Sequence, residues 1–148
     1  MHYDTYLFIV VRNINATRGS KAMNTETNDI EFTDNYITAW STTDDATREK
    51  LVTTLYVSDA DFYAEEPGDG PVERHGRAEI AENIRQVNLR LVQGKGLVTE
   101  KTGFSRNHDI VKVVWKMSTP DGVIMMTGMN MLKCGADGMI VRDYIFIG

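Results

Sequence analysis

Three polar side chains lie among apolar neighbours, where a polar group needs either a partner or a function. Asp143 and Asn130 each alternate with apolar residues along strand-like segments, and Tyr36 lies on the apolar side of a predicted helix. A carboxyl group on an apolar face is costly to bury unless it is paired or its pKa is raised. Asp143 therefore either bonds the backbone or an arginine near a strand end, or faces a pocket. Asn130 is either a hydrogen-bonded core amide or a second pocket group.

Several common chemistries are excluded by the residues available. The sequence has no GxxxxGKS/T phosphate-binding loop and no GxSxG nucleophile motif. Its three histidines and one cysteine are scattered without the spacing of metal ligands, so we expect no metal and no cofactor. The cysteine, Cys134, follows a strand and is expected to be inert.

The composition is typical of one globular domain. The 148 residues are 42 % apolar and 25 % charged, which suits a single core. The net charge of −5 argues against nucleic acid as a partner, because affinity for a phosphate backbone needs clustered positive charge. The apolar run 6–11 is far shorter than the roughly 20 residues of a membrane span, and a lone cysteine is usual in a reducing compartment. We therefore expect a cytoplasmic protein that does not bind membranes.

The first 27 residues do not follow the pattern of the rest. Residues 13–28 are polar and show neither helical nor strand periodicity, and a second methionine, Met23, lies within them. We interpret 1–27 as a peripheral or disordered leader and 28–148 as the domain. The alternative is that residues 6–11 add a strand or pack in a groove.

Periodicity predicts three helices in the first half of the domain. Asn28 and Glu31 resemble a capping box that opens the first helix, and Asp44 is a natural N-cap for the second. The third helix is expected over about 77–93. The apolar face of the second helix is formed by Leu51, Val52, Leu55 and Tyr56.

Strands follow the helices. A short strand is expected at 59–63 and a loop at 65–70. After residue 94 the period changes to 2, with strands at 111–117, 123–133 and 139–147. The face that carries Asp143 would also hold Met139, Val141, Ile145 and Ile147. Helices first and antiparallel strands afterwards indicate an α+β fold, with the helices on one face of a curved sheet.

The segment 123–133 is apolar on both faces of its predicted strand. A sheet with one face in water shows alternating apolar and polar residues, and helices can cover only one face. We therefore expect a second subunit to cover the other face, giving a homodimer.

The order of elements and several short strings resemble the nuclear transport factor 2-like superfamily, in its SnoaL-like polyketide cyclase and ketosteroid isomerase branches. The resemblance covers about 30–146 and is carried by Tyr36, by LYVSDA at 55–60, by HGR at 75–77 with Ile80, and by DGMI at 137–140. It implies a cone-shaped, curved mixed or antiparallel sheet wrapped around three N-terminal helices, with a pocket at the wide end. It also implies a homodimer.

The resemblance implies roles for four residues. Tyr36 falls where the isomerase branch has a tyrosine that donates to an enolate oxygen, and Asn130 falls where that branch has a protonated aspartic acid as second donor. An amide NH₂ can also donate, so an altered oxyanion hole is expected. Glu66 falls at the position of the general base, and Asp143 falls at a pocket-facing position of the last strand.

The resemblance therefore implies a small-molecule pocket protein, an isomerase, cyclase or lyase acting beside a carbonyl group. The expected ligand is a small apolar molecule with one carbonyl or phenolate oxygen. The alternatives are a non-catalytic binding domain and a dimerisation module whose pocket has closed. The residues expected to line the pocket are Trp40, Tyr56, Phe62, Trp115, Met126 and Ile145.

Overall fold

The computed structural model describes residues 19–66 and 70–148, and the side chains of 28–65 and 70–148. The chain divides into two units, Met1–Glu31 and Phe32–Gly148. Residues 6–11, which in the alternative interpretation add a strand or pack in a groove, lie outside the described residues. The interpretation of 1–27 as a peripheral or disordered leader therefore stays a prediction. No helix in the described part of the chain is long and apolar enough to cross a membrane.

In the part of the chain that the structure describes, three α-helices precede most of the sheet, and the third continues into a π-helical turn. The first helix begins at Gly19, nine residues before Asn28, so the prediction that a capping box at Asn28 opens this helix is wrong. The preceding residues include good helix formers such as Lys21, Ala22 and Met23 and contain no proline. Asp44 is confirmed as an N-cap, because its carboxylate accepts from the Thr47 N–H at 3.0 Å. The bounds are α2 (Gly19–Ser41), α3 (Asp45–Leu55), α4 (Arg77–Val87) and η1 (Asn88–Gln93).

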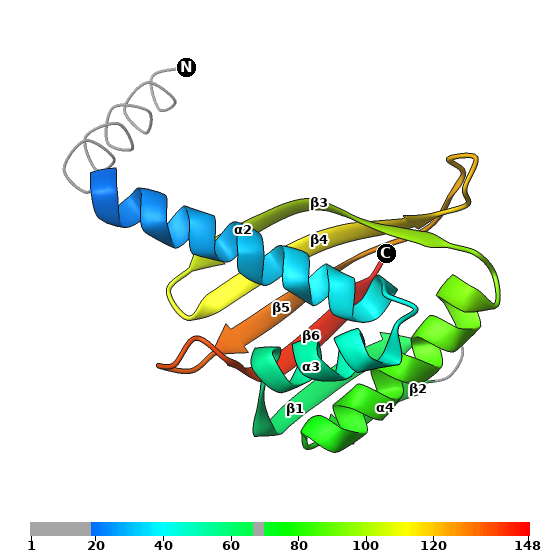
Figure 1. Cartoon of the computed structure of the whole chain (residues 1–148), viewed down its shortest axis with the longest axis horizontal. Helices are drawn as coiled ribbons and strands as arrows, with labels where there is room; N and C mark the ends of the chain where they lie inside the picture. The colour runs from blue at the N-terminus through cyan, green and yellow to red at the C-terminus, as the bar shows by residue number, and fades with distance from the viewer. Residues whose placement is uncertain (1–18, 67–69) are drawn as a thin grey trace. The chain divides into compact units, whose positions relative to one another are not determined.

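Six strands form one mixed sheet in the order β2-β1-β6-β5-β4-β3. The pair β1–β6 is parallel and the other four pairs are antiparallel. Figure 1 shows α3 and α4 against one face of this sheet. The predicted α+β fold class is confirmed. The strands are β1 (Tyr56–Glu66), β2 (Gly70–His75), β3 (Val98–Asn107), β4 (Ile110–Ser118), β5 (Ile124–Cys134) and β6 (Ile140–Ile147).

The strands differ from expectation in three places. Tyr56 is the first residue of β1 and not part of the apolar face of α3, because the chain turns to extended geometry there. β1 extends to Glu66, so 65–70 is not all loop, and β2 pairs with it as a hairpin. β3, which pairs along the whole of β4, was also not expected.

The inner face of the sheet meets the helices and holds the core. Along β5 the buried residues alternate, with Gly128, Asn130 and Leu132 inside. The prediction that Met139 and Val141 share the face of Asp143 is wrong at the start of β6. Ile140 is buried together with Asp143, although strict alternation would place them on opposite faces. The pairing of β5 with β6 shifts here, because Lys133 pairs with Arg142 but the next residue, Cys134, pairs with Ile140. Val141 is therefore an extra residue on β6, and this bulge turns Ile140 inward.

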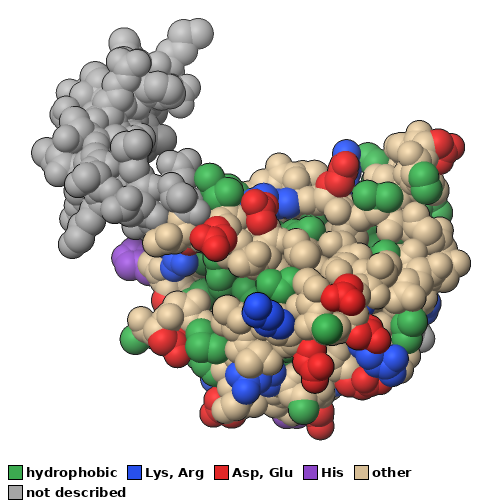
Figure 2. Space-filling view, viewed as in Figure 1, with side chains coloured by type: hydrophobic (Ala, Val, Ile, Leu, Met, Phe, Trp, Pro, Cys, Tyr) green, Lys and Arg blue, Asp and Glu red, His purple; other side chains and the backbone are tan. Residues whose placement is uncertain are grey.

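The outer face of the sheet carries an apolar patch. Met129 and Met131 lie on the outward side of β5 and are only half-buried, and their neighbours Tyr144 and Phe146 lie beside them on β6. Phe146 is 52 % exposed. Figure 2 shows the opposite side of the molecule, where the helices lie, and there charges of both signs are interspersed.

A homodimer through this outer patch stays a prediction. Light scattering at micromolar concentration should report twice the mass of one chain, and Met129→Lys should reduce it to one chain because a charge would then be buried. The fold of the variant should be intact, since Met129 lies outside the core. A wild-type monomer, or a Met129→Lys protein that keeps the doubled mass, contradicts the prediction.

Candidate functional site

Four polar side chains from four elements meet inside the domain, all of them buried. Tyr36 comes from α2, Tyr56 from the start of β1, Asn130 from β5 and Asp143 from β6. The Tyr36 hydroxyl donates to Asp143 Oδ2 at 2.8 Å, and the Tyr56 hydroxyl donates to the same oxygen at 2.6 Å. Asn130 Nδ2 donates to Asp143 Oδ1 at 2.7 Å and to the Tyr36 oxygen at 2.5 Å. The three polar residues singled out from the sequence therefore converge.

A fifth residue fixes the direction of these bonds. The Trp115 indole N–H, which can only donate, bonds to Asn130 Oδ1 at 2.8 Å. The amide oxygen of Asn130 must therefore face Trp115, and its NH₂ must face Tyr36 and Asp143. Both amide protons are used there. When Asp143 is ionised, the hydroxyls of both tyrosines, the amide of Asn130 and the indole N–H of Trp115 all donate to other members of this cluster.

Burial sets the protonation of the cluster. It raises the pKa of Asp143 to about 6, against the opposing effect of the hydrogen bonds from Tyr56, Asn130 and Tyr36. Burial and the neighbouring Asp143 charge raise the pKa of both Tyr36 and Tyr56 well above 10. The tyrosines therefore stay protonated, and Asp143 is the group that titrates near neutral pH.

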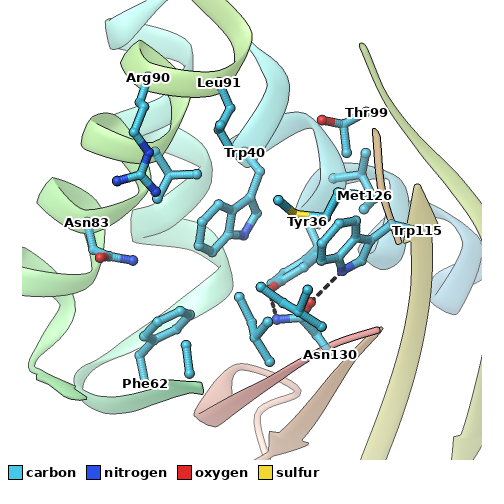
Figure 3. Close-up of a pocket in the computed structure, with 15 residues that line it drawn as sticks. Tyr36, Trp40, Phe62, Asn83, Arg90, Leu91, Thr99, Trp115, Met126 and Asn130 are labelled. Carbon is cyan, nitrogen blue, oxygen red and sulfur yellow. Dashed lines mark hydrogen bonds between the residues drawn. The ribbon is translucent and has the colours of Figure 1, made fainter. Parts of the chain in front are cut away.

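Beside the cluster lies a cavity of about 380 Å³ between the helices and the sheet. Tyr36 and Asn130 form part of its wall (Figure 3), whereas Asp143 and Tyr56 are fully buried and do not line it. Among the described residues, no aspartate or glutamate lines this cavity. A bound molecule would therefore contact Tyr36 and Asn130 directly, and Asp143 only through these two side chains.

Five of the six residues expected to line a pocket do so: Trp40, Phe62, Trp115, Met126 and Ile145. Tyr56 does not, because its side chain is fully buried against Asp143. Glu66 is the last residue of β1, and its side chain lies outside the described part of the chain. A role for Glu66 as base stays a prediction.

The cavity also has polar residues that sequence reasoning missed. Asn83 and Arg90 line it from α4 and η1, and Thr99 lines it from β3. Asn88 holds η1 in place, since its buried amide donates to the carbonyls of Trp40 at 2.8 Å and Thr42 at 2.9 Å. The sequence did contain a signal for these residues. Asn83, Val87 and Arg90 are four and three residues apart, and residues at this spacing share one face of a helix.

Trp115 is positioned by a glycine. Gly128 lies opposite Trp115 on the neighbouring strand, and a Cβ on Gly128 would come within 2.5 Å of the indole ring. The absence of a side chain at Gly128 lets the indole lie flat enough to reach Asn130 and to wall the cavity. In the described part of the chain, no three His, Cys, Asp or Glu side chains are grouped to hold a metal.

Comparison by sequence gives no match to a protein-family model or to a curated protein. Comparison by structure gives many. A SnoaL-like family protein from Agrobacterium tumefaciens has a TM-score of 0.71 at 18 % identity, over 82 % of this chain and 98 % of the other. A SnoaL-like protein from Burkholderia thailandensis has a TM-score of 0.60 at 15 % identity, over 80 % and 92 % of the two chains.

A third similar structure, from Catenulispora acidiphila, has a ketosteroid isomerase-like fold and is a complex with trimethylamine. Its TM-score is 0.56 at 16 % identity, over 78 % of this chain and 84 % of the other. Together these similarities show that the chain has the SnoaL-like, nuclear transport factor 2-like fold, which confirms the fold expected from the sequence. At such identities they define the fold alone.

Proposed function

We propose that the protein binds a compact, mostly apolar carbonyl compound in the cavity and moves protons at it, as an isomerase, cyclase or lyase does. The observation that carries this proposal is the pairing of the Tyr36 hydroxyl, on the cavity wall, with a buried carboxyl whose pKa is about 6. A group with a pKa near the working pH is well suited to acid–base catalysis. The ketosteroid isomerase-like fold of one similar structure agrees with it as an analogy.

Proton counting assigns the roles. With Asp143 ionised, the Tyr36 proton points to Asp143 and one lone pair of the Tyr36 oxygen accepts from Asn130, so the cavity meets only the remaining lone pair of this oxygen. When Asp143 carries a proton, it donates that proton to a tyrosine oxygen, and the Tyr36 proton is free to turn toward a ligand carbonyl. Tyr36 is then the donor to the ligand and Asp143 supplies its proton. Because Asp143 is protonated in this state, removal of a C–H proton falls to Glu66.

A second candidate function is binding without catalysis. It is favoured by the absence of any aspartate or glutamate from the cavity wall among the described residues. Above pH 6 the wall offers acceptors at its polar end, which suits a ligand that donates, such as an amine. A similar structure binds trimethylamine.

Ketone binding should depend on pH. The affinity for 1-indanone, measured by calorimetry, should rise by more than about tenfold between pH 8 and pH 5, because the competent state is the one with Asp143 protonated. Tyr36→Phe should weaken binding and remove this dependence, while keeping the ring and its packing. Affinity that is the same at both pH values, or unaffected by Tyr36→Phe, contradicts the proposal.

Catalysis is separated from binding by hydrogen exchange at the carbon beside the carbonyl. In deuterated buffer the wild type should exchange the C2 hydrogens of 1-indanone faster than buffer alone, as followed by NMR, and Tyr36→Phe should slow this about 100-fold. Tight binding without exchange would select the second candidate function.

A further inference from the structure

The outer face of the sheet carries opposite charges on its two sides. This is the face turned away from α3 and α4 (Figure 1). On β1 and β2, the side chains of Asp61, Glu65 and Glu73 alternate with more buried residues and point outward. On β4 and β5, the side chains of Lys112 and Lys133 do the same. The outer face is therefore acidic on one side and basic on the other.

The two lysines of the basic side have no partner in the described part of their own chain. Among the described residues, no ion pair or side-chain hydrogen bond engages Lys112 or Lys133. Glu73 is four strand spacings from Lys112, roughly 19 Å along the sheet, so one chain cannot pair them. On the acidic side, the His75 ring lies 2.8 Å from Asp61 Oδ1 and 3.3 Å from Glu73 Oε2, and it holds both carboxylates on the outer face.

The strand register places these residues in two rows across the outer face. The first row, from β2 to β4, is Glu73, Tyr63, Tyr144, Met131 and Lys112. The second row, from β2 to β5, is His75, Asp61, Arg142 and Lys133. In each row an acid and a lysine lie equally far from the residue on β6: two strands away in the first row and one strand away in the second. The charges of this face are therefore balanced about β6.

This balance gives one orientation in which the face is complementary to itself. A twofold axis along β6 exchanges the acidic and basic sides, so that Lys112 of a second copy lies over Glu73, and its Lys133 lies over Asp61. Arg142, on the axis, has Asp61 beside it on the neighbouring strand. An axis across the strands would instead place each acid over the same acid. Like charges that meet across an interface cost several kcal/mol, so the axis along β6 is favoured.

We infer that two copies of this chain pair through their outer faces about a twofold axis along β6, with the acidic side of each copy over the basic side of the other. The rings of Tyr63 and Tyr144, stacked with their centres 5.2 Å apart, lie with Met131 at the middle of this interface. Aromatic residues and methionine are enriched in interface cores, and charges belong at the rim. The orientation does not depend on the proposed function, because none of these residues lines the cavity.

Reversing one charge at a time tests this orientation. In a dimer of one variant, Glu73→Lys places two lysine pairs in contact, and Lys112→Glu places two glutamate pairs in contact. Each variant alone should therefore dimerise at least about tenfold more weakly than the wild type in sedimentation experiments. An equal mixture of the two variants should form a heterodimer with about the affinity of the wild-type dimer, because both contacts then join opposite charges. Raising sodium chloride from about 0.05 to 0.5 M should reduce the difference between the mixture and the separate variants.

Two further charge reversals are the matched controls. Glu49→Lys and Lys50→Glu make the same changes of net charge at exposed positions of α3, on the other face of the sheet, and each should leave dimerisation unchanged. A control that weakens dimerisation as much as the outer-face variants would indicate a general charge effect and overturns the inference.

The remaining outcomes separate the orientation from the homodimer itself. A wild-type monomer overturns both. If Glu73→Lys and Lys112→Glu each dimerise as the wild type does, the homodimer through the outer patch stands and the orientation is overturned. A mixture that stays monomeric when the wild type is a dimer also overturns the orientation, because the two reversed residues then do not meet.

Discussion

When the pH is raised from 4 to 7, the free energy of unfolding of the wild type is expected to fall by about 2 kcal/mol relative to that of Asp143→Asn. The pKa of Asp143 is raised from 3.8 to about 6 in the folded state, mainly by burial. Between these values the folded protein holds a proton that the unfolded chain has released. Stability from this group is therefore full below pH 4 and lost as the pH rises through 6.

Urea denaturation of both proteins across this pH range measures the effect. The difference in unfolding free energy between Asp143→Asn and the wild type should grow with pH and level off above about pH 7, because the amide in the variant cannot ionise. Other titrating groups are common to both proteins and cancel. A difference that is flat with pH would mean that the three donors around Asp143 fully offset its burial.

Gly128→Ala is expected to destabilise the protein by about 2–3 kcal/mol, in the upper part of the range of about 1–3 kcal/mol for overpacking a core. The added Cβ would lie within 2.5 Å of the Trp115 ring and 2.9 Å of the Phe146 carbonyl oxygen, and the backbone at Phe146 cannot yield without breaking the sheet. Trp115 must move, which breaks its bond to Asn130 and changes the cavity wall. Thermal unfolding and tryptophan fluorescence should both report the change.

Gly103→Ala is the control for this substitution. Gly103 is a strand glycine in the same sheet, and a Cβ there meets no atom within 4 Å. The same chemical change should therefore be close to neutral at Gly103. Equal effects at the two positions would show that the cost at Gly128 comes from the strand glycine itself and not from Trp115.

The sequence predicted the inner part of the site because its signal was a polar residue in an apolar pattern. Tyr36, Asn130 and Asp143 each broke such a pattern, and they meet in the structure. Tyr56 was misplaced because it lies at the point where α3 ends and β1 begins, so that it fits the apolar face of the helix equally well. Its long-range bond to Asp143 has no local signal.

The elements missed from the sequence are the edges of the sheet. β2 and β3 are its two outermost strands, and most of their residues are exposed or half-buried. An edge strand needs few apolar residues, since only part of one face meets the core. Arg90 escaped notice for a related reason: as an exposed charged residue near a helix end it looks like ordinary surface until the helix is placed beside the cavity.

The position of β6 bears on the order in which the domain assembles during folding. β6 is the last strand along the chain, yet it lies between β1 and β5 and is the only link between the β1–β2 hairpin and the strands β3 to β5 in the described sheet. A nascent chain that lacks these residues can form the hairpin and the three-stranded meander but cannot join them. It also lacks Asp143, the shared acceptor of both tyrosines. Because contacts so distant in sequence close slowly, the buried cluster should form late, as the step that commits the two halves to one sheet.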